Sequence, residues 1–597
     1  MYKTETVELS EKEKKSEVHQ FSECIIKDGM YGEIKQVKIV DKESNKIIET
    51  KESFVPAGGA VYVEEIEENI DTLEVMLKLY FTKGEEKKVI YFPRGDLVDT
   101  KVLTLASYGV QVTKQTSALF IKSIMNQEIN AQRILTYEKL GFSEYKGRKL
   151  FKGCEAIGIE AKYTGQLRVS PKGSYDTYKG MIEREVKGQT ALEFILAVSI
   201  SGMLVDFLKD RMSLENVVVH LVGQSSTGKT TSALLAVASG SAPDFKGDNF
   251  VFSFQDTQNS LMRLIPSSYP TLIDEGSLIG KKDMTQAMYS LSSGVEKRRM
   301  TKNLETQEVS KFKTAIILTS EKSILNQCNE NSGLLVRNIE IDNEVFTKSA
   351  ESADRIKNII KNNYGFLVEK TAQYLLDKGE EKIGEMVSRE THDLIKKAKE
   401  NKEYNNLTER SAKQTALILA SVDILKEVLS INFDKSSINE FMHKHSLIKD
   451  EESVSLGRRA MDYLLQIISK DYTLFIREEG AEIRNCKGKI KKIPKKLLKT
   501  GEESTKKLLI TREEFVNLLQ QGLFSEEKII LKEWKELGYL QSQKDRYISK
   551  ISIIQGIETK GYAIYLPSQE KETIVHKPKS KKEDFDFEKE DEIDFED

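Results

Sequence analysis

Residues 217–230 read VVVHLVGQSSTGKT, an apolar β-branched run that passes directly into a glycine-rich loop. The last eight residues match the pattern G-x-x-x-x-G-K-[ST], and the following segment, TSALLAVAS, has a helical composition. A loop between a strand and a helix can close its backbone N–H groups around phosphate oxygens, and the helix N-terminus adds positive potential. This stretch therefore predicts a P-loop on a parallel α/β sheet.

Each position of the loop has an expected role. Lys229 should reach the β- and γ-phosphates of ATP, and Thr230 should ligate Mg²⁺. The other loop positions expected to contact the nucleotide are Gly223, Gln224, Ser225, Ser226, Thr227, Gly228 and Thr231. The predicted cofactors are therefore ATP and Mg²⁺, and the flanking strand and helix argue against a loop without a nucleotide.

A second motif follows in YPTLIDE, residues 269–275, where an apolar run ends in two carboxylates. In a parallel sheet such a run delivers its last side chains to the carboxyl edge, where ligands bind. Asp274 is expected to hold the Mg²⁺ shell and Glu275 to polarise the attacking water. The alternative is a strand end that carries two surface acids.

The region around these motifs alternates strands with helices, which predicts βαβ units and a mainly parallel sheet. We expect five strands, at residues 217–222, 249–254, 269–274, 314–319 and 337–342. A strand and a helix separate the two motifs, which is the order of the AAA+ and RecA-like classes. On that order Thr319, or its neighbour Ser320, would hold the water or the γ-phosphate from the central strand.

Two further cationic positions follow. Arg337 begins the predicted fifth strand, where AAA+ rings carry an arginine finger that acts on the neighbouring subunit's nucleotide. Pairing with a surface acid is the alternative for this arginine. In the predicted helix LTERSAKQTALILASVDIL, Arg410 or Lys413 would contact the nucleotide as a second sensor.

Between Glu275 and the central strand the sequence leaves room for a basic hairpin. Its cations are Lys297, Arg298, Arg299 and Lys302. In a ring these side chains would grip the phosphates of one DNA strand irrespective of sequence. A solvated surface hairpin is the alternative.

The C-terminal third predicts a winged helix, with two helices in ITREEFVNLLQQGLFSEEKIILKEWKELGYL and strands in RYISKISI and GYAIYLP. The second helix would be the recognition helix. Cations near it are Lys528, Lys532, Lys535, Lys544 and Arg546. DNA is the expected partner of this region, and a protein partner is the alternative.

Charge is segregated along the 597 residues, whose formal net charge is −3. Residues 583–597 carry ten acids and one lysine, so the remainder of the chain carries +6. Residues 484–499 hold eight lysines or arginines and no acid, which suits a phosphate backbone or a solvated loop. The acidic segment also contains Phe585, Phe587, Ile593 and Phe595. It is expected to bind a partner such as a replication protein, or to act only through repulsion that favours solubility.

Composition narrows the class of protein further. The four cysteines lie far apart with no C-x-x-C pair, which argues against a disulfide framework or a zinc ribbon. The longest apolar stretch, residues 194–205, is shorter than the roughly 20 residues that cross a bilayer. The N-terminus lacks a signal-peptide pattern. We therefore expect a cytoplasmic protein with no membrane span.

The predicted fold class is a multidomain α/β protein with an AAA+ P-loop core. The expected parts are a β-rich N-terminal domain (1–100), a helical or linker region (101–185), the P-loop core (186–345), a helical lid (346–430), a winged-helix region (431–570) and an acidic disordered tail (571–597).

Four segments together resemble a known helicase family. They are NVVVHLVGQSSTGKTTSALLAVASGSAP, FQDTQNSLMRLIPSSYPTLIDEGS, TAIILTSE and GLLVRNIEI. The family comprises self-loading, minichromosome-maintenance-like AAA+ replicative helicases of phages, plasmids and staphylococcal cassette and pathogenicity-island elements. The resemblance covers residues 100–430 through these motifs and the winged-helix end more loosely.

The resemblance implies a hexameric ring on single-stranded or forked DNA, with Arg337 as the finger and residues 297–302 as the pore hairpin. Some relatives carry a fused primase, for which this sequence has no signature. The function favoured by these observations is an ATP-dependent hexameric DNA helicase that serves replication of a mobile element. The alternative is an ATP-switched initiator or loader without unwinding activity. An unfoldase is disfavoured because the expected pore segment is basic.

Overall fold

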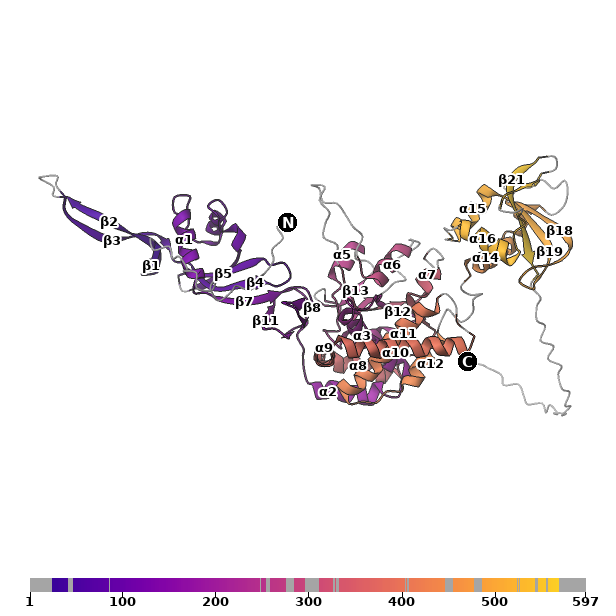
Figure 1. Cartoon of the computed structure of the whole chain (residues 1–597), viewed down its shortest axis with the longest axis horizontal. Helices are drawn as coiled ribbons and strands as arrows, with labels where there is room; N and C mark the ends of the chain where they lie inside the picture. Colours follow the sequence, from indigo (N-terminus) through magenta and orange to yellow (C-terminus); the bar gives the residue numbers. More distant parts are fainter. Residues whose placement is uncertain are drawn as a thin grey trace, which may run out of the picture. The chain divides into compact units, whose positions relative to one another are not determined.

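The computed structural model divides into two compact units, Met1–Val454 and Ser455–Asp597 (Figure 1). The structure describes residues 24–40, 47–84, 86–246, 249–253, 258–274, 284–295, 311–325, 328, 332–402, 404, 407–445, 455–476, 486–522, 524, 527–542, 546–554 and 557–568. The expected acidic tail, 571–597, lies outside these residues.

A five-stranded parallel sheet forms the centre of the first unit, with the strand order β13-β14-β15-β12-β16. Its strands are β12 (Val217–Val222), β13 (Val251–Ser253), β14 (Thr271–Asp274), β15 (Ala315–Ser320) and β16 (Asn338–Asp342). The five strands and their parallel arrangement are therefore confirmed, with bounds that shift by one or two residues. Strand β15, which carries Thr319, lies between β12, which precedes the P-loop, and β14, which ends in Asp274. This is the central position that was expected for the strand of Thr319.

Helices cover both faces of the sheet, because its strands are apolar on both faces. All six residues of β12 are buried, which is the pattern of a strand covered by helices on each side. The helices within this part of the chain are α4 (Lys229–Val237), α5 (Gln258–Leu264), α6 (Thr285–Ser293) and α7 (Ser332–Leu335).

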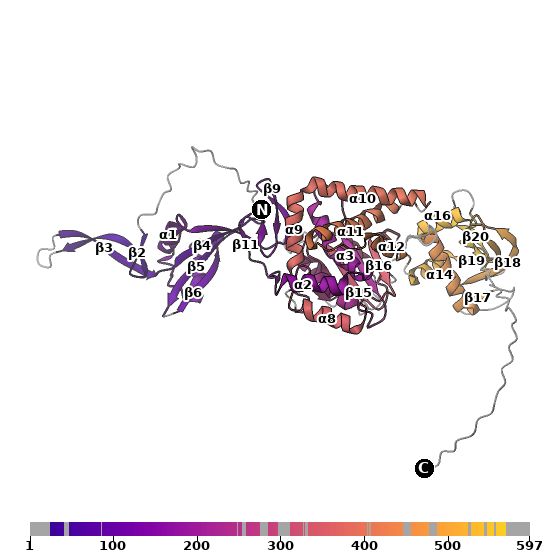
Figure 2. The ribbon, with the colours of Figure 1, turned by 90° about the horizontal axis from the view of Figure 1, so that it is seen from below.

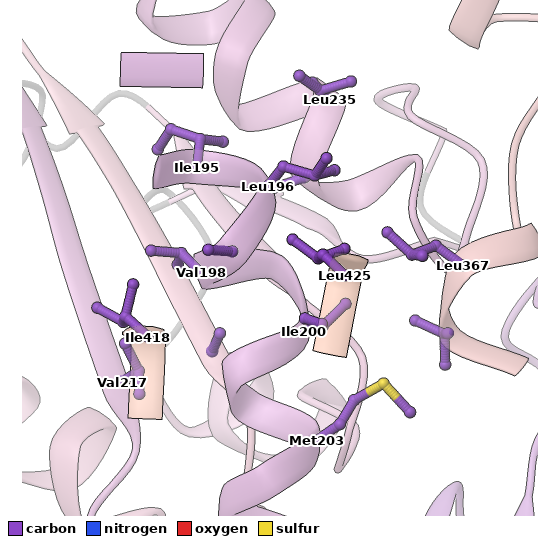
Figure 3. Close-up of a cluster of buried hydrophobic side chains, with 14 of the residues drawn as sticks. Ile195, Leu196, Val198, Ile200, Met203, Val217, Leu235, Leu367, Ile418 and Leu425 are labelled. Carbon is purple, nitrogen blue, oxygen red and sulfur yellow. The ribbon is translucent and has the colours of Figure 1, made fainter. Parts of the chain in front are cut away.

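Helix α3 (Thr190–Phe207) packs against β12 and β15 of the sheet. Seventeen of its 18 residues are buried, and a helix that is apolar all round is stable only when it is enclosed. Figure 3 shows its side chains packed with Val217 of β12, Leu235 of α4 and Ile418 of a later helix. Each fully buried aliphatic side chain contributes about 1.5–3 kcal/mol to stability.

Helix α3 is also long and apolar enough to cross a membrane, the single such helix in the part of the chain that the structure describes. However, 94% of that stretch is buried inside the protein, so it serves as the core helix of this unit.

A helical layer follows β16. It contains α8 (Ala350–Ile360), α9 (Phe366–Lys378), α10 (Glu380–Glu400), α11 (Thr408–Leu429) and α12 (Lys435–Lys444). Helix α10 lies alongside α11, and α11 packs against α3 (Figure 2). Helix α12 belongs to the first unit and not to the C-terminal region that the sequence analysis began at residue 431, because Ile438, Phe441 and Met442 are buried in the same core as α3.

The N-terminal part contains three small sheets, with orders β1-β2-β3, β11-β7-β4-β5-β6 and β10-β9-β8. The strands are β1 (Cys24–Lys27), β2 (Met30–Val40), β3 (Ile47–Gly59), β4 (Tyr62–Asn69), β5 (Val75–Lys83), β6 (Glu86–Pro93), β7 (Gln132–Tyr137), β8 (Gly141–Tyr145), β9 (Arg148–Lys152), β10 (Ala156–Ile157) and β11 (Ala161–Tyr163). The described residues of 1–100 are thus mostly β-strands, with a short 3-10 turn at Arg94–Asp96.

The expectation of a helical region over 101–185 is wrong for most of that span. It contains helices α1 (Ser117–Glu128) and α2 (Tyr175–Met181), a short π-helical turn at Ile182–Val186, and the five strands β7 to β11. Strand β7 pairs in parallel with β4, with Gln132 opposite Glu65. A partner strand more than 60 residues away outweighs local helical spacing, because pairing and burial rather than periodicity decide the conformation.

The second unit has its own sheet, in the order β17-β18-β19-β21-β20. Its elements are α14 (Leu456–Lys470), β17 (Phe475–Ile476), β18 (Gly488–Leu497), β19 (Glu503–Thr511), α15 (Arg512–Gln521), α16 (Glu527–Leu537), β20 (Ser549–Ile551) and β21 (Thr559–Pro567). Trp534 of α16 is fully buried and donates a 2.6 Å hydrogen bond to the carbonyl of Gly457. The two expected helices and two terminal strands are present, but they join a larger sheet instead of a two-stranded wing.

Candidate functional site

The carboxyl edge of the central sheet carries a pocket of about 840 Å³. Strands β12, β14 and β15 end there, so the loop after β12 and the last residues of the other two strands face the same space. From the sequence-predicted set it brings together Ser225, Ser226, Gly228, Lys229, Thr230, Thr231, Asp274, Thr319 and Ser320. This convergence follows from the parallel sheet, since all its strands point their carboxyl ends the same way.

The glycines shape the loop between β12 and α4. Gly228 has φ of 87° and begins the helix as its N-cap residue, a conformation that L side chains rarely adopt. A Cβ built there would lie 2.9 Å from the hydroxyl oxygen of Thr347. The loop is therefore held close to the segment that follows β16, which also donates the Phe346 N–H to the Thr227 carbonyl at 3.0 Å.

Lys229 is the first residue of α4 and is 9% exposed. Its ammonium group donates to the carbonyl oxygens of Gly223 at 2.7 Å and Gln224 at 2.5 Å, so the side chain folds over the loop. Burial lowers the pKa of this amine, while Glu321 and Asp274 act in the opposite direction. The arrangement places a partly desolvated cation in the loop's concave face.

Asp274 and Thr319 contact each other directly across neighbouring strands. The Thr319 hydroxyl donates a hydrogen bond to the Asp274 carboxylate. The adjacent residue, Ser320, is instead hydrogen-bonded to Nε2 of the fully buried His220 at 2.7 Å. Of the two sensor candidates, Thr319 is therefore the one that touches the expected metal-binding carboxylate.

His220 is a residue that the sequence analysis did not single out. Its Nδ1 lies 3.1 Å from Glu340 of β16, so the imidazole links three adjacent strands through Ser320 and Glu340. A lone histidine in an apolar run, VVVHLV, gives no signal of these partners, which lie 100 and 120 residues away.

Helix α8 also lines the pocket, which the sequence analysis did not anticipate. Thr347, Lys348 and Lys357 face it from this side, and Ser349 caps the helix by accepting a hydrogen bond from the Ser352 N–H at 3.2 Å. The capping serine preceding an amphipathic run was a usable signal for the helix start. Nothing local indicated that this start would face the P-loop.

The donor set fits ATP with Mg²⁺. A hydroxyl at Thr230 and a carboxylate at Asp274 are the hard oxygen ligands that Mg²⁺ takes alongside phosphate oxygens and water. The N-terminus of α4 and the Lys229 amine offer positive potential for the phosphates. Among the described residues no group of three or more histidine, cysteine or acidic side chains is placed to hold a metal without such a ligand.

Arg337 lies at the opposite edge of the sheet. It directly precedes β16, whose first residue, Asn338, pairs with Val218 near the start of β12. The P-loop follows the other end of β12, four residues further on, which at about 3.3 Å per residue is roughly 13 Å away. Arg337 therefore cannot contact the pocket of its own chain by its strand position.

The guanidinium of Arg337 is held by its own chain in this structure. Its Nε donates to Glu215 at 3.0 Å and its Nη1 donates to the Gly333 carbonyl at 2.8 Å. The group also lies 5.1 Å from the ring centroid of Tyr289. The acid-paired arrangement named as the alternative is therefore the one present in the single chain.

Arg410 and Lys413 lie at this same opposite edge. Together with Glu215 they line a smaller cavity of about 340 Å³, and the neighbouring Gln414 donates to the Arg337 carbonyl at 3.2 Å. Neither residue lines the P-loop pocket of its own chain, so a sensor role stays a prediction. Helix α11 packs along α3 and α10 with its first turn beside the segment that enters β12.

Several sequence-predicted residues fall outside the part of the chain that the structure describes. They are Glu275, Lys297, Arg298, Arg299, Lys302 and, in the second unit, Lys544. In the second unit Lys528 and Lys532 of α16 are exposed, whereas Lys535 is half-buried.

Two family models match parts of the chain. One is described as a domain of unknown function, DUF927, and covers residues 34–311. The other is described as the Cch helix turn helix domain and covers residues 455–569, beginning at the first residue of the second unit. No curated protein matches the sequence.

The structure is similar to a solved structure described as SCCmec type IV Cch, active helicase. The TM-score is 0.70 at 23% identity, covering 92% of this chain and 98% of that chain. A structure of the C-terminal region of NrS-1 covers 64% of this chain and 92% of its own at 11% identity, with a TM-score of 0.23 that carries no argument. The first similarity shows that the two chains share a fold over nearly their whole lengths.

Proposed function

We propose that this protein is an ATP-dependent DNA helicase that acts as a ring of AAA+ subunits in replication of a mobile genetic element. The observation that carries the proposal is the pocket in which Lys229, Thr230, Asp274 and Thr319 converge, on a fold shared with a chain described as an active helicase. The helix-turn-helix model over the second unit supports DNA as the partner, and we place the activity in the cytoplasm.

ATP hydrolysis needs neutralised phosphate charge and an oriented water. In the proposed mechanism Lys229 binds the β- and γ-phosphates, Thr230 and Asp274 hold Mg²⁺, and the Thr319 hydroxyl orients the Asp274 carboxylate. The bound Mg²⁺ supplies charge neutralisation for the transferred phosphoryl group. Glu275, the residue after Asp274, polarises the attacking water.

The distance between the two edges of the sheet supports the ring. Arg337 lies roughly 13 Å of strand away from its own P-loop, so a role in catalysis would be at the site of a neighbour. We propose that Arg337 is this finger, in a hexamer, and that it exchanges its contact with Glu215 for the neighbour's nucleotide. Arg410 and Lys413, beside it, would then face the same interface.

DNA contacts are proposed for two regions. The basic segment with Lys297, Arg298, Arg299 and Lys302 would grip a single strand inside the ring through its phosphates. In the second unit, which we propose is a winged helix, Lys528 and Lys532 on α16 would contact a duplex backbone.

The test is strand displacement of a forked duplex with ATP and Mg²⁺. Unwinding by the intact chain, and none by Lys229→Ala, supports the helicase. ATPase activity that responds to DNA without strand displacement would instead support the ATP-switched initiator or loader. Glu275→Gln should bind ATP and hold it unhydrolysed, because it keeps shape but loses the base.

A further inference from the structure

The second unit contains a groove of about 1450 Å³ that the proposed ATPase and DNA contacts do not use. One side is α14 and the other is the sheet, at β18, β19 and the end of β21. Among its mostly polar lining are four apolar residues, Leu465, Ile468, Ile490 and Leu566, which we call the groove floor. A groove with such a floor favours an occupant that brings apolar side chains of its own.

The rim of the groove is positively charged. Lys470, Lys492 and Lys506 are exposed along it, and Asp462 is the one acid among its lining residues. Lys492 lies directly opposite Lys506 on the neighbouring strand, and the next pair, Lys491 and Lys507, is also lysine on lysine. Like charges at directly opposed strand positions repel each other and destabilise a sheet. An anion bound between these lysines would therefore reduce the repulsion and stabilise the sheet.

No acid of the described residues forms an ion pair with Lys492 or Lys506. This contrasts with Lys495, further along β18, which contacts Glu503 at 2.5 Å. Lys492 and Lys506 therefore line the groove without an acid partner among the described residues.

We propose that the acidic C-terminal segment of this same chain, residues 583–597, docks into this groove. The segment carries ten acids and one lysine, and it interleaves them with Phe585, Phe587, Ile593 and Phe595. Acids can meet the lysine rim while the aromatic rings meet the apolar floor. A nucleic-acid backbone offers the charge but no apolar groups at that spacing, which favours the peptide as the occupant.

The place where the strand ends also favours this segment. Pro567 and Ser568, at the end of β21, are themselves part of the groove lining. Residues 569–582 separate them from the acidic segment, and fourteen residues reach at most about 50 Å. A tether of this length keeps the segment within reach and makes docking an intramolecular step at high effective concentration.

The experiment uses the chain that ends at Lys582 and a labelled peptide of residues 583–597, with binding followed by fluorescence anisotropy. The truncated chain should bind the peptide saturably. The full chain should bind it at least about tenfold more weakly, because its own segment occupies the groove. Equal affinity for the two chains would overturn the proposal, since the groove would then not be filled in cis.

Two matched comparisons locate the site. Lys492→Glu with Lys506→Glu should weaken peptide binding to the truncated chain at least tenfold, whereas Lys550→Glu with Lys560→Glu should leave it within twofold. The latter pair is also exposed and cross-strand, but lies at the β20–β21 edge. Equal effects of the two charge reversals would indicate nonspecific attraction and contradict docking in the groove.

The peptide itself provides the second control. Replacing its three phenylalanines and one isoleucine by serine keeps the charge of −9 but removes the apolar groups. Its affinity should fall at least tenfold, and unchanged affinity would overturn the role of the groove floor. If the Lys492 and Lys506 reversal instead abolishes binding of a DNA oligonucleotide while peptide binding persists, the groove is a nucleic-acid site and the proposal fails.

Discussion

The two edges of the central sheet use cations in opposite ways. At the carboxyl edge Lys229 is buried in a loop, donates to loop carbonyls and faces Asp274, Thr319 and the start of α8. At the amino edge Arg337 is half-buried and held by Glu215, beside the first turn of α11. The carboxyl edge gathers the motif residues around one pocket, whereas the amino edge holds a cation that is paired with an acid of its own chain. In the proposed ring, the amino edge of one chain would complete the pocket at the carboxyl edge of the next.

Lys229→Ala should produce the largest effect. It removes the cation that contacts the phosphates in both the bound and the reacting state, so both ATP binding and turnover should be lost, a fall of more than about 10²–10³-fold. Steady-state ATPase and nucleotide-binding titrations measure this. Lys357→Ala, at the α8 side of the same pocket, is the comparison and should lose less than roughly tenfold. Substantial activity in Lys229→Ala would contradict the assignment of the carboxyl edge.

Arg337→Ala should leave ATP affinity unchanged and lower turnover by about 10³–10⁵-fold, the effect of removing an arginine finger. Because the proposed ring has the amino edge act on a neighbour, mixing this variant with Lys229→Ala should partly restore ATPase activity in mixed rings. If the mixed rings exchange subunits and stay inactive, either Arg337 acts in cis or the ring needs every site to be intact. A fully active Arg337→Ala would show that the pairing with Glu215 is the residue's whole role.

Thr319→Val should retain ATP binding and lower turnover by roughly 10²-fold, because the Asp274 carboxylate loses its hydroxyl donor and its position. Ser320→Ala should lower turnover less, since Ser320 contacts His220 and not Asp274. Single-turnover ATPase rates of the two variants decide between them. A larger loss of turnover in Ser320→Ala than in Thr319→Val would show that Ser320, and not Thr319, is the sensor.

Arg410→Ala should have the smallest effect on ATP affinity, within about twofold, because the residue lies beside Glu215 at the amino edge. An effect on turnover that appears only in assembled rings would agree with a role at the interface. Nucleotide titration of Arg410→Ala against Arg337→Ala makes the comparison. A strong loss of ATP affinity in Arg410→Ala, but not in Arg337→Ala, would show that Arg410 contacts the nucleotide bound by its own chain.

The motifs could be predicted because their signals are local. The β-branched run before Gly223, the loop that ends at Lys229 and the acidic end of YPTLIDE each specify a conformation and a chemistry within about ten residues. The parallel pattern then required those strand ends to share one edge. The part of the pocket that the motifs form was therefore predictable, whereas the residues that α8 and its preceding segment contribute were not.

The features that the sequence did not predict arose where distant segments meet. Residues 132–137 have helical spacing but form β7, because β4 is available as a parallel partner. Arg410 has the expected helix around it, yet the packing of α11 on α3 carries its first turn to the amino edge. Nothing near Lys357 in the sequence indicates that α8 would cover the P-loop.

The sequence by itself determined the strands of the central sheet, the P-loop and the carboxylate beside it, since backbone preference, side-chain period and loop glycines are properties of short segments. Only the tertiary structure decided which cations lie at which edge, that His220 joins Ser320 to Glu340, and that Lys492 pairs with Lys506 on the neighbouring strand beside a groove. Those outcomes depend on how helices and strands far apart in the chain pack together, and that packing is selected by the burial of the whole core rather than by any one segment.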